Sequence, residues 1–131
     1  MMRLAARVGE RSPVHATALG KVMAAGLEVD RVKAILKGEG MPALTPRTIT
    51  SVAGYLTELK AVAAQGFAVD DLEAQSDGRC VAVALKGLPF LCGLSVSAPA
   101  NRLPQEAVLS TVKLLQKSAA AIVKDFRSYP A

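Results

Sequence analysis

The stretch that decides the fold is residues 66–99, GFAVDDLEAQSDGRCVAVALKGLPFLCGLSVSAP. Its bulky apolar residues alternate with small or polar ones, which is the period-two pattern of β-strands with two unlike faces. The pattern predicts strands at 67–70, 80–85 and 90–97, with a polar link at 71–78. The short loop before the last strand indicates that the second and third strands form a hairpin.

The register of this hairpin sorts its side chains onto two faces. A symmetric loop would pair Leu85 with Phe90 and Cys80 with Ser95. One face then carries the bulky residues Val81, Val83, Leu85, Phe90, Cys92, Leu94 and Val96. The other carries Cys80, Ala82, Ala84, Leu91, Gly93, Ser95 and Ser97. The bulky face must pack against helices, whereas the small face leaves room for either a closely packed helix or a ligand with polar groups.

Helical periodicity predicts helices on both sides of the strands. The first has Thr17 as N-cap and ends before Gly26, and the second covers 28–37. Thr48 or Thr50 caps a third, with Gly66 at its end. The inward positions of this third helix are Val52, Leu56, Leu59 and Ala63. A long helix follows Pro104, and its inward positions are Val108, Val112, Leu115, Ala119, Ile122 and Phe126. With a short strand at 2–8, this order predicts an α+β fold with helices packed on an antiparallel sheet.

Composition indicates one globular domain spanning residues 1–131. The chain is 51% apolar, 4% aromatic and 21% charged, and is long enough to bury a core without disulfides or a structural metal. Cys80, Cys92 and the single His15 do not have zinc-ligand spacing, so no metal or cofactor is predicted. We expect reduced thiols and a cytoplasmic protein, because neither a signal peptide nor a membrane-spanning run is present.

The net charge of +5 raises the possibility of a nucleic-acid surface. The basic residues, however, are spread over several predicted elements, and the sequence has two Tyr and no Trp to stack on bases. We interpret the charge as ordinary solvated helix surface.

Two features of the chain suggest groups for a ligand. The first predicted helix begins with Thr17, Ala18 and Leu19, and the unpaired N–H groups of a helix start can hold a carboxylate, although plain capping explains them as well. Asp70 and Asp71 follow a strand, where they are suited to accept hydrogen bonds from a ligand hydroxyl or to form a turn.

Four motifs carry a family resemblance that covers nearly the whole chain. They are RSPVHATALGKVMAAGL at 11–27, GFAVDDLE at 66–73, GRCVAVAL at 78–85 and LSVSAPANRL at 94–103. In this order they resemble the effector-binding domain of IclR-type transcriptional regulators. The resemblance implies a GAF-like sensory domain that binds a small organic or aromatic acid, forms dimers or tetramers, and adjusts the DNA affinity of a winged helix-turn-helix domain.

The resemblance also implies where the ligand lies, between the first helix and the sheet. It assigns backbone contacts to Ala18 and Leu19, and side-chain contacts to Asp70, Cys80 and Ser95. Cys80 and Ser95 share the small face of the hairpin on the independent argument from register.

The sequence departs from the family pattern in several places. Only Glu73 remains of the acidic pair usual in the link, and Ala98 stands where glycine is usual. No helix-turn-helix precedes Met1, so we expect a chain without a DNA-binding domain and a GAF-like sheet without the family's first strand. The edge left by that strand should favour pairing with another chain.

Two other functions compete with a sensor. A structural oligomerisation domain with a filled pocket would use the same sheet and the same alanine-rich helices. A small hydrolase would need Cys80 or Ser95 as nucleophile and His15, the only imidazole, within hydrogen-bond reach. His15 precedes a helix in a proline-containing segment, where packing is the more natural role, so we expect no enzyme activity.

Overall fold

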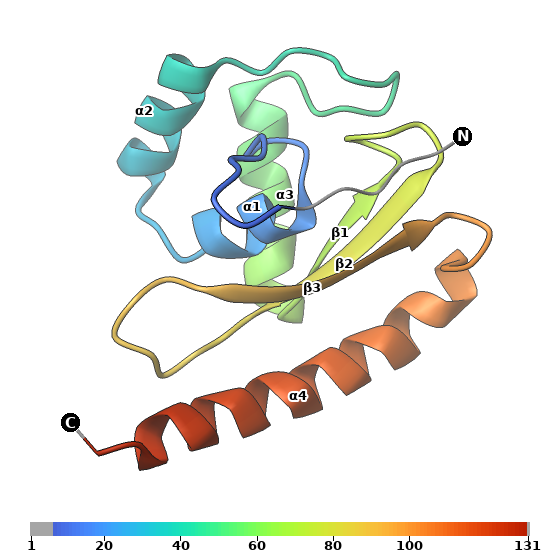
Figure 1. Ribbon diagram of the computed structural model, residues 1–131. Coiled ribbons are helices and arrows are strands. Elements are labelled where there is room, and N and C mark those ends of the chain that lie inside the picture. The colour runs from blue at the N-terminus through green and yellow to red at the C-terminus, as the bar shows by residue number, and fades with distance from the viewer. Residues whose placement is uncertain (1–6, 131) are drawn as a thin grey trace.

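The computed structural model describes residues 7–130. Its elements, in chain order, are α1 (Ala18–Ala24), α2 (Val29–Glu39), α3 (Val52–Gln65), β1 (Ala68–Asp71), β2 (Gly78–Ala84), β3 (Gly93–Pro99), the 3-10 turn η1 (Gln105–Ala107) and α4 (Val108–Ser128). The first three helices lie on one side of the sheet and α4 lies across the other (Figure 1). The predicted α+β fold is confirmed.

The strands form an antiparallel sheet in the order β1-β2-β3. The predicted register of the hairpin is wrong by two residues, since Cys80 pairs with Ser97 and Ser95 pairs with Ala82. The Leu85 N–H donates to the Cys92 carbonyl oxygen at 2.9 Å, so the connection is six residues, 86–91, and not four. An even shift leaves the paired residues on their predicted faces, because side chains alternate with a period of two, whereas Phe90 and Leu91 lie in the loop and on neither face.

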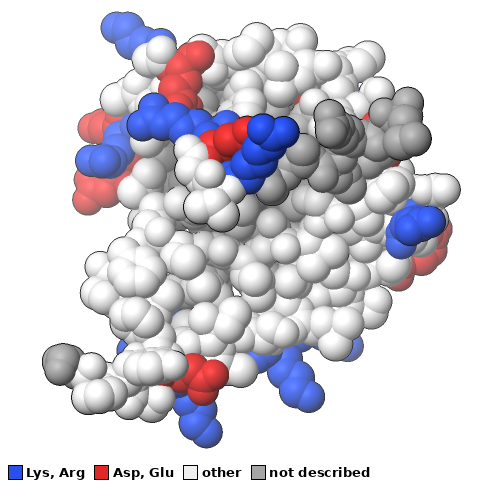
Figure 2. All heavy atoms as spheres, in the orientation of Figure 1, with Lys and Arg blue, Asp and Glu red and all other residues white. Residues whose placement is uncertain are grey.

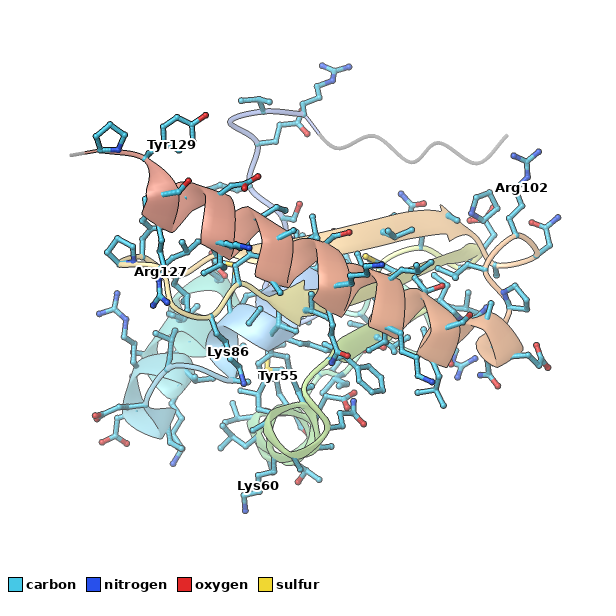
Figure 3. All side chains as sticks on the ribbon, turned by 90° about the horizontal axis from the view of Figure 1, so that it is seen from below. Tyr55, Lys60, Lys86, Arg102, Arg127 and Tyr129 are labelled. Carbon is cyan, nitrogen blue, oxygen red and sulfur yellow. The ribbon has the colours of Figure 1, made fainter. Side chains whose placement is uncertain are left out.

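The bulky face of the sheet packs against α4. Its core consists of Val81, Val83, Leu85, Leu103, Val112, Leu115 and Ala119. Figure 3 shows α4 running across the strands, with Lys86 and Arg127 toward the same end of the helix. The apolar stripe of α4 is buried only in its first part, because Ile122 and Phe126 are more than two-fifths exposed. Phe126 instead makes an edge-to-face contact with Phe90, which lies in the loop.

The small face of the sheet packs closely against α1 at one end only. Ala68 and Ala82 contact Ala18 and Val22 of α1 in a second core cluster. A Cβ added at Gly93 would lie 2.9 Å from Leu19 Cδ2 and 3.2 Å from the Val83 carbonyl oxygen, so a side chain at this position would force the Leu19 side chain to move. The other end of the same face, at Cys80 and Ser97, borders a cavity.

The structure corrects the start of α3. Its N-cap is Ser51, whose Oγ accepts from the Gly54 N–H at 3.1 Å, and not Thr48 or Thr50. Thr48 is occupied elsewhere, since its Oγ1 donates to the Glu73 carbonyl oxygen at 2.6 Å. The end of α3 is as predicted, with Gly66 in the left-handed conformation at φ 85°.

Two further predictions about local structure need correction or stay open. The buried face of α3 is Tyr55, Leu59 and Val62, whereas Val52 and Ala63 are exposed. Residues 2–6 of the strand predicted at 2–8 lie outside the described part of the chain, and Arg7 and Val8 are not in a strand.

Charged side chains lie mainly at the margins of the face seen in Figure 2. Lys, Arg, Asp and Glu gather at its upper left, at its right edge and along its lower margin, with a largely neutral surface between them. Over residues 7–130, no helix is long and apolar enough to cross a membrane.

Candidate functional site

A cavity of about 460 Å³ opens between the start of α1, the turn at 70–75 and the small face of the sheet. Its lining residues are Ser12, Pro13, Thr17, Ala18, Leu19, Leu44, Asp70, Ala74, Gln75, Gly78, Arg79, Cys80, Ser95 and Ser97. All five predicted site residues are among them. The fold therefore brings together, in one cavity, groups that are up to 77 positions apart in the sequence, from Ala18 to Ser95.

The floor of the cavity is a row of polar side chains across three strands. Asp70 of β1 pairs with Cys80 of β2, and Cys80 pairs with Ser97 of β3. Ser95 lies two residues along β3 from Ser97, on the same face. Sequence reasoning chose Ser95 as the neighbour of Cys80 and did not single out Ser97, because the assumed loop was two residues too short.

The start of α1 forms another wall. Thr17 is the N-cap, as predicted: its Oγ1 accepts from the Gly20 N–H at 3.1 Å and donates to the Pro13 carbonyl oxygen at 2.8 Å. The first intrahelical bond runs from the Lys21 N–H to the Thr17 carbonyl oxygen. The amides of Ala18 and Leu19 come before that bond, in the part of a helix where N–H groups lack intrahelical partners.

Asp70 holds the turn that forms the third wall. Its Oδ1 accepts from the amides of Glu73 at 2.8 Å and Ala74 at 3.2 Å, so the turn-forming interpretation of this residue is correct. Burial raises the pKa of Asp70, and the nearby Glu73 carboxylate adds to that effect, while the two amides and Lys21 act against it.

Arg79 lines the cavity but its charge is already paired. It donates to Asp71 Oδ1 through Nε at 3.1 Å and Nη2 at 2.8 Å, and its Nη1 donates to the Leu103 carbonyl oxygen at 2.7 Å. Burial alone would raise the pKa of Asp71, but Arg79, together with Arg47, outweighs it and lowers that pKa. Asp71 is thus a structural partner of Arg79 and does not line the cavity.

Sequence reasoning missed a buried lysine beside this site. Lys21 is fully buried, and its Nζ donates to Glu73, Glu58 and the Val69 carbonyl oxygen. The available signal was its position on the buried face of α1, three residues after Ala18 and three before Ala24. Its partners are 37 to 52 residues away along the chain, so local periodicity does not identify them.

The geometry opposes a thiol hydrolase. Burial raises the pKa of Cys80 even though Ser97 and Ser95 hydrogen bonds act against the shift, and a nucleophilic cysteine needs the opposite. His15 Nε2 lies 2.9 Å from the Pro42 carbonyl oxygen, and His15 is not part of the cavity wall. Among residues 7–130, no group of three or more His, Cys, Asp or Glu is placed to hold a metal ion.

Two other hollows contain none of the predicted residues. One, of about 550 Å³, lies between β2 and α4 and is bordered by Lys86, Lys124 and Arg127. The other, of about 570 Å³, lies beneath the 86–91 loop. The first is lined mainly by residues of β2 and α4 and the second mainly by apolar residues in and around the 86–91 loop, whereas the cavity at α1 has polar groups from three directions.

Comparison with known proteins identifies the family. The family model described as the bacterial transcriptional regulator IclR C-terminal domain matches residues 1–124. The chain belongs to this family. Its curated relatives are named transcriptional regulators and repressors, which is consistent with a regulatory, non-enzymatic domain.

Similar proteins agree with this assignment in sequence and in fold. The HTH-type transcriptional regulator KdgR of Escherichia coli is 35% identical over 98% of this chain and 51% of its own length. XynR of the same organism is 33% identical over 95% of the chain and 50% of its own length. The chain thus spans about half the length of these relatives.

Solved structures show the same domain. The C-terminal domain of E. coli KdgR has a TM-score of 0.79 and 37% identity, covering 88% of this chain and 72% of that one. The inducer binding domain of PobR from Acinetobacter, a double mutant in complex with 3-hydroxybenzoic acid, has a TM-score of 0.80 and 27% identity, covering 94% and 74%. This chain is therefore an IclR-type effector-binding domain.

Proposed function

We propose that residues 1–131 act as one sensory unit that binds a small organic or aromatic acid in the cavity at α1. The observation that carries this proposal is that Ala18, Leu19, Asp70, Cys80 and Ser95 all line this one cavity. Its volume of about 460 Å³ lies in the range of small-molecule sites. A filled pocket, the alternative of a purely structural domain, is harder to reconcile with this volume.

The polar groups suit an acid that also carries a hydroxyl. Its carboxylate would lie near the amides of Ala18 and Leu19, and its hydroxyl would face Asp70, Cys80 and Ser95. The 3-hydroxybenzoic acid bound by the PobR domain belongs to this chemical class. Phosphorylated ligands fit less well, because Arg79, the one Lys or Arg that residues 7–130 place on the cavity wall, is already paired with Asp71.

The output of such a sensor would be DNA binding by a helix-turn-helix module, as the names of the relatives suggest. For the bound acid to act, it must have different affinities for two states of the whole regulator. We expect that regulator to work in the cytoplasm as a dimer or tetramer. The β3 strand supports self-association, since it lies at the edge of the sheet of described residues and carries no charged side chain.

The test is a thermal-shift screen of the purified chain against small carboxylic and hydroxyaromatic acids at millimolar concentration. A ligand at about 100 times its Kd should add roughly 2.7 kcal/mol to the free energy of unfolding. Ser95→Leu fills the cavity, so we expect the ligand-induced shift to disappear, with an overpacking cost of about 1 to 3 kcal/mol in the absence of ligand.

Ser118→Leu is the matched control, because Ser118 is an exposed residue of α4 on the other side of the sheet. This variant should keep the full ligand-induced shift. A stable wild-type chain that responds to none of the acids, or a Ser95→Leu variant that responds as the wild type does, would count against the sensor.

A further inference from the structure

Lys21 connects three elements through one buried ammonium group. Its side chain is 0% exposed, and Nζ donates to both carboxylate oxygens of Glu73 at 2.8 and 2.9 Å. It also donates to the Val69 carbonyl oxygen of β1 at 2.8 Å and to Glu58 Oε2 of α3 at 3.1 Å. The ammonium therefore has partners on α3, on β1 and in the 70–75 turn.

Two walls of the cavity meet at this group. Lys21 lies on α1, whose first residues form one wall, and Glu73 lies in the 70–75 turn, which forms another. Glu73 Oε2 also accepts from the Asp71 N–H at 2.9 Å, while Asp70 Oδ1 accepts from the Glu73 N–H. The position of the Asp70 carboxyl is thus tied, through Glu73, to the position of α1.

The 70–75 turn needs such a restraint because its backbone is strained. Leu72 has φ 60°, a left-handed conformation that a branched, non-glycine residue rarely adopts. Strain of this kind persists only where surrounding contacts impose it. Here they come from Thr45 Oγ1, which donates to the Leu72 carbonyl oxygen at 2.6 Å, and from the Glu73 bonds to Lys21.

We propose that Lys21 is a positioning residue that sets the spacing between α1 and the 70–75 turn, and so the shape of the effector cavity. Lys21 does not line the cavity and would touch no ligand. The proposal rests on the proposed function in taking this cavity as the effector site. The spacing that Lys21 sets between α1 and the 70–75 turn does not depend on whether a ligand binds there.

A purely stabilising role is the alternative, and it predicts a different response to neutralising the pair. Removing one partner of a buried ion pair leaves an unpaired charge, whereas replacing both partners by neutral residues often restores stability. Lys21→Met/Glu73→Gln removes both charges of the pair. If Lys21 only stabilises the fold, this variant should behave as the wild type once it is folded.

The experiment follows alkylation of each thiol by iodoacetamide, measured residue by residue by mass spectrometry. Cys80 lies on the cavity wall, and Cys92 packs against the core on the other face of the sheet, so Cys92 is an internal reference. In Lys21→Met/Glu73→Gln we expect Cys80 to react about tenfold faster relative to Cys92, equivalent to opening that is easier by about 1.4 kcal/mol.

Glu58→Gln is the matched control. It weakens a bond to the same ammonium, but Glu58 belongs to α3 and is not part of the cavity wall. We expect its Cys80 rate to stay within twofold of the wild-type rate. If the double variant gives no folded protein, the single variant Glu73→Gln is tested instead. We expect a smaller rise in its Cys80 alkylation rate, because Gln keeps an acceptor for Lys21 but loses the charge.

An unchanged Cys80 rate in the folded Glu73 variants would overturn the proposal, as would an equal rise in Glu58→Gln. The readout uses no effector. A wild-type chain that binds no acid therefore contradicts the proposed function, whereas an unchanged Cys80 rate contradicts the role of Lys21.

Discussion

At the scale of single residues, Asp70 and Asp71 show how neighbours acquire opposite electrostatic roles. Successive residues of a strand point to opposite faces, so Asp70 faces the buried cavity side while Asp71 meets Arg79 and Arg47. Burial raises the pKa of Asp70, and the arginines lower the pKa of Asp71 in spite of its own partial burial. Ionisation of the two side chains should therefore have opposite effects on the stability of the folded chain.

For Asp70→Asn we expect a gain in stability, relative to wild type, that appears as pH rises. Because the folded-state pKa is raised, ionisation of Asp70 disfavours the folded chain from its ordinary pKa of 3.8 upward, and the asparagine avoids that cost. Asn retains a carbonyl oxygen for the Glu73 and Ala74 amides. Urea unfolding of both proteins between pH 3 and 7 measures the difference.

Asp71→Asn is the matched comparison, with the opposite sign. A lowered pKa stabilises the folded chain above the ordinary value, and that contribution is lost as pH falls through the folded-state pKa. This variant should be less stable than wild type at neutral pH and approach it in acid. Parallel pH profiles for the two variants would contradict the assignment of their environments.

At the scale of elements, α3 depends on a cap that sequence pattern did not identify. Ser51 caps the Gly54 amide, whereas Thr50 is exposed. Ser51→Ala should lower the free energy of unfolding by about 1 kcal/mol. Thr50→Ala should change it by less than about 0.5 kcal/mol. Chemical denaturation of both variants measures this, and an equal loss in the two would show that the cap is misassigned.

The same elements explain why some predictions held and others did not. The N-cap Thr17 and the end of α3 at Gly66 follow from local backbone requirements, and both are confirmed. Thr48 had the right chemistry for a cap, but its hydroxyl is taken by Glu73, 25 residues away. Such a competition between a local and a distant partner is decided only by the tertiary fold.

At the scale of the whole molecule, the alternation of side chains along the strands predicted the structure of the sheet better than the predicted pairing of residues did. The predicted pairing of Cys80 was wrong by two residues, yet the residues that pair in β2 and β3 lie on the predicted faces, because an even shift does not change which face a side chain is on. The gathering of the five site residues in one cavity was likewise predictable from faces and the family resemblance. The Lys21 network was not, since it joins α1, α3 and the 70–75 turn only after they have packed.

The two faces of the sheet have different roles in the structure. The bulky face and α4 bury a continuous apolar core, while the small face leaves a polar cavity beside α1. A ligand in that cavity would contact residues of α1, β1, β2 and β3 together. The affinity for this ligand would therefore depend on how these four elements are placed relative to one another.

The most direct test of the sensory account is an NMR titration of the isotope-labelled chain with 3-hydroxybenzoate and related hydroxy acids. We expect the largest amide shift changes at Ala18, Leu19, Cys80 and Ser95, around the cavity at α1. Changes centred instead on Gln116, Ala120 and Lys124, beside the hollow under α4, would contradict the account, and so would a spectrum that no acid alters.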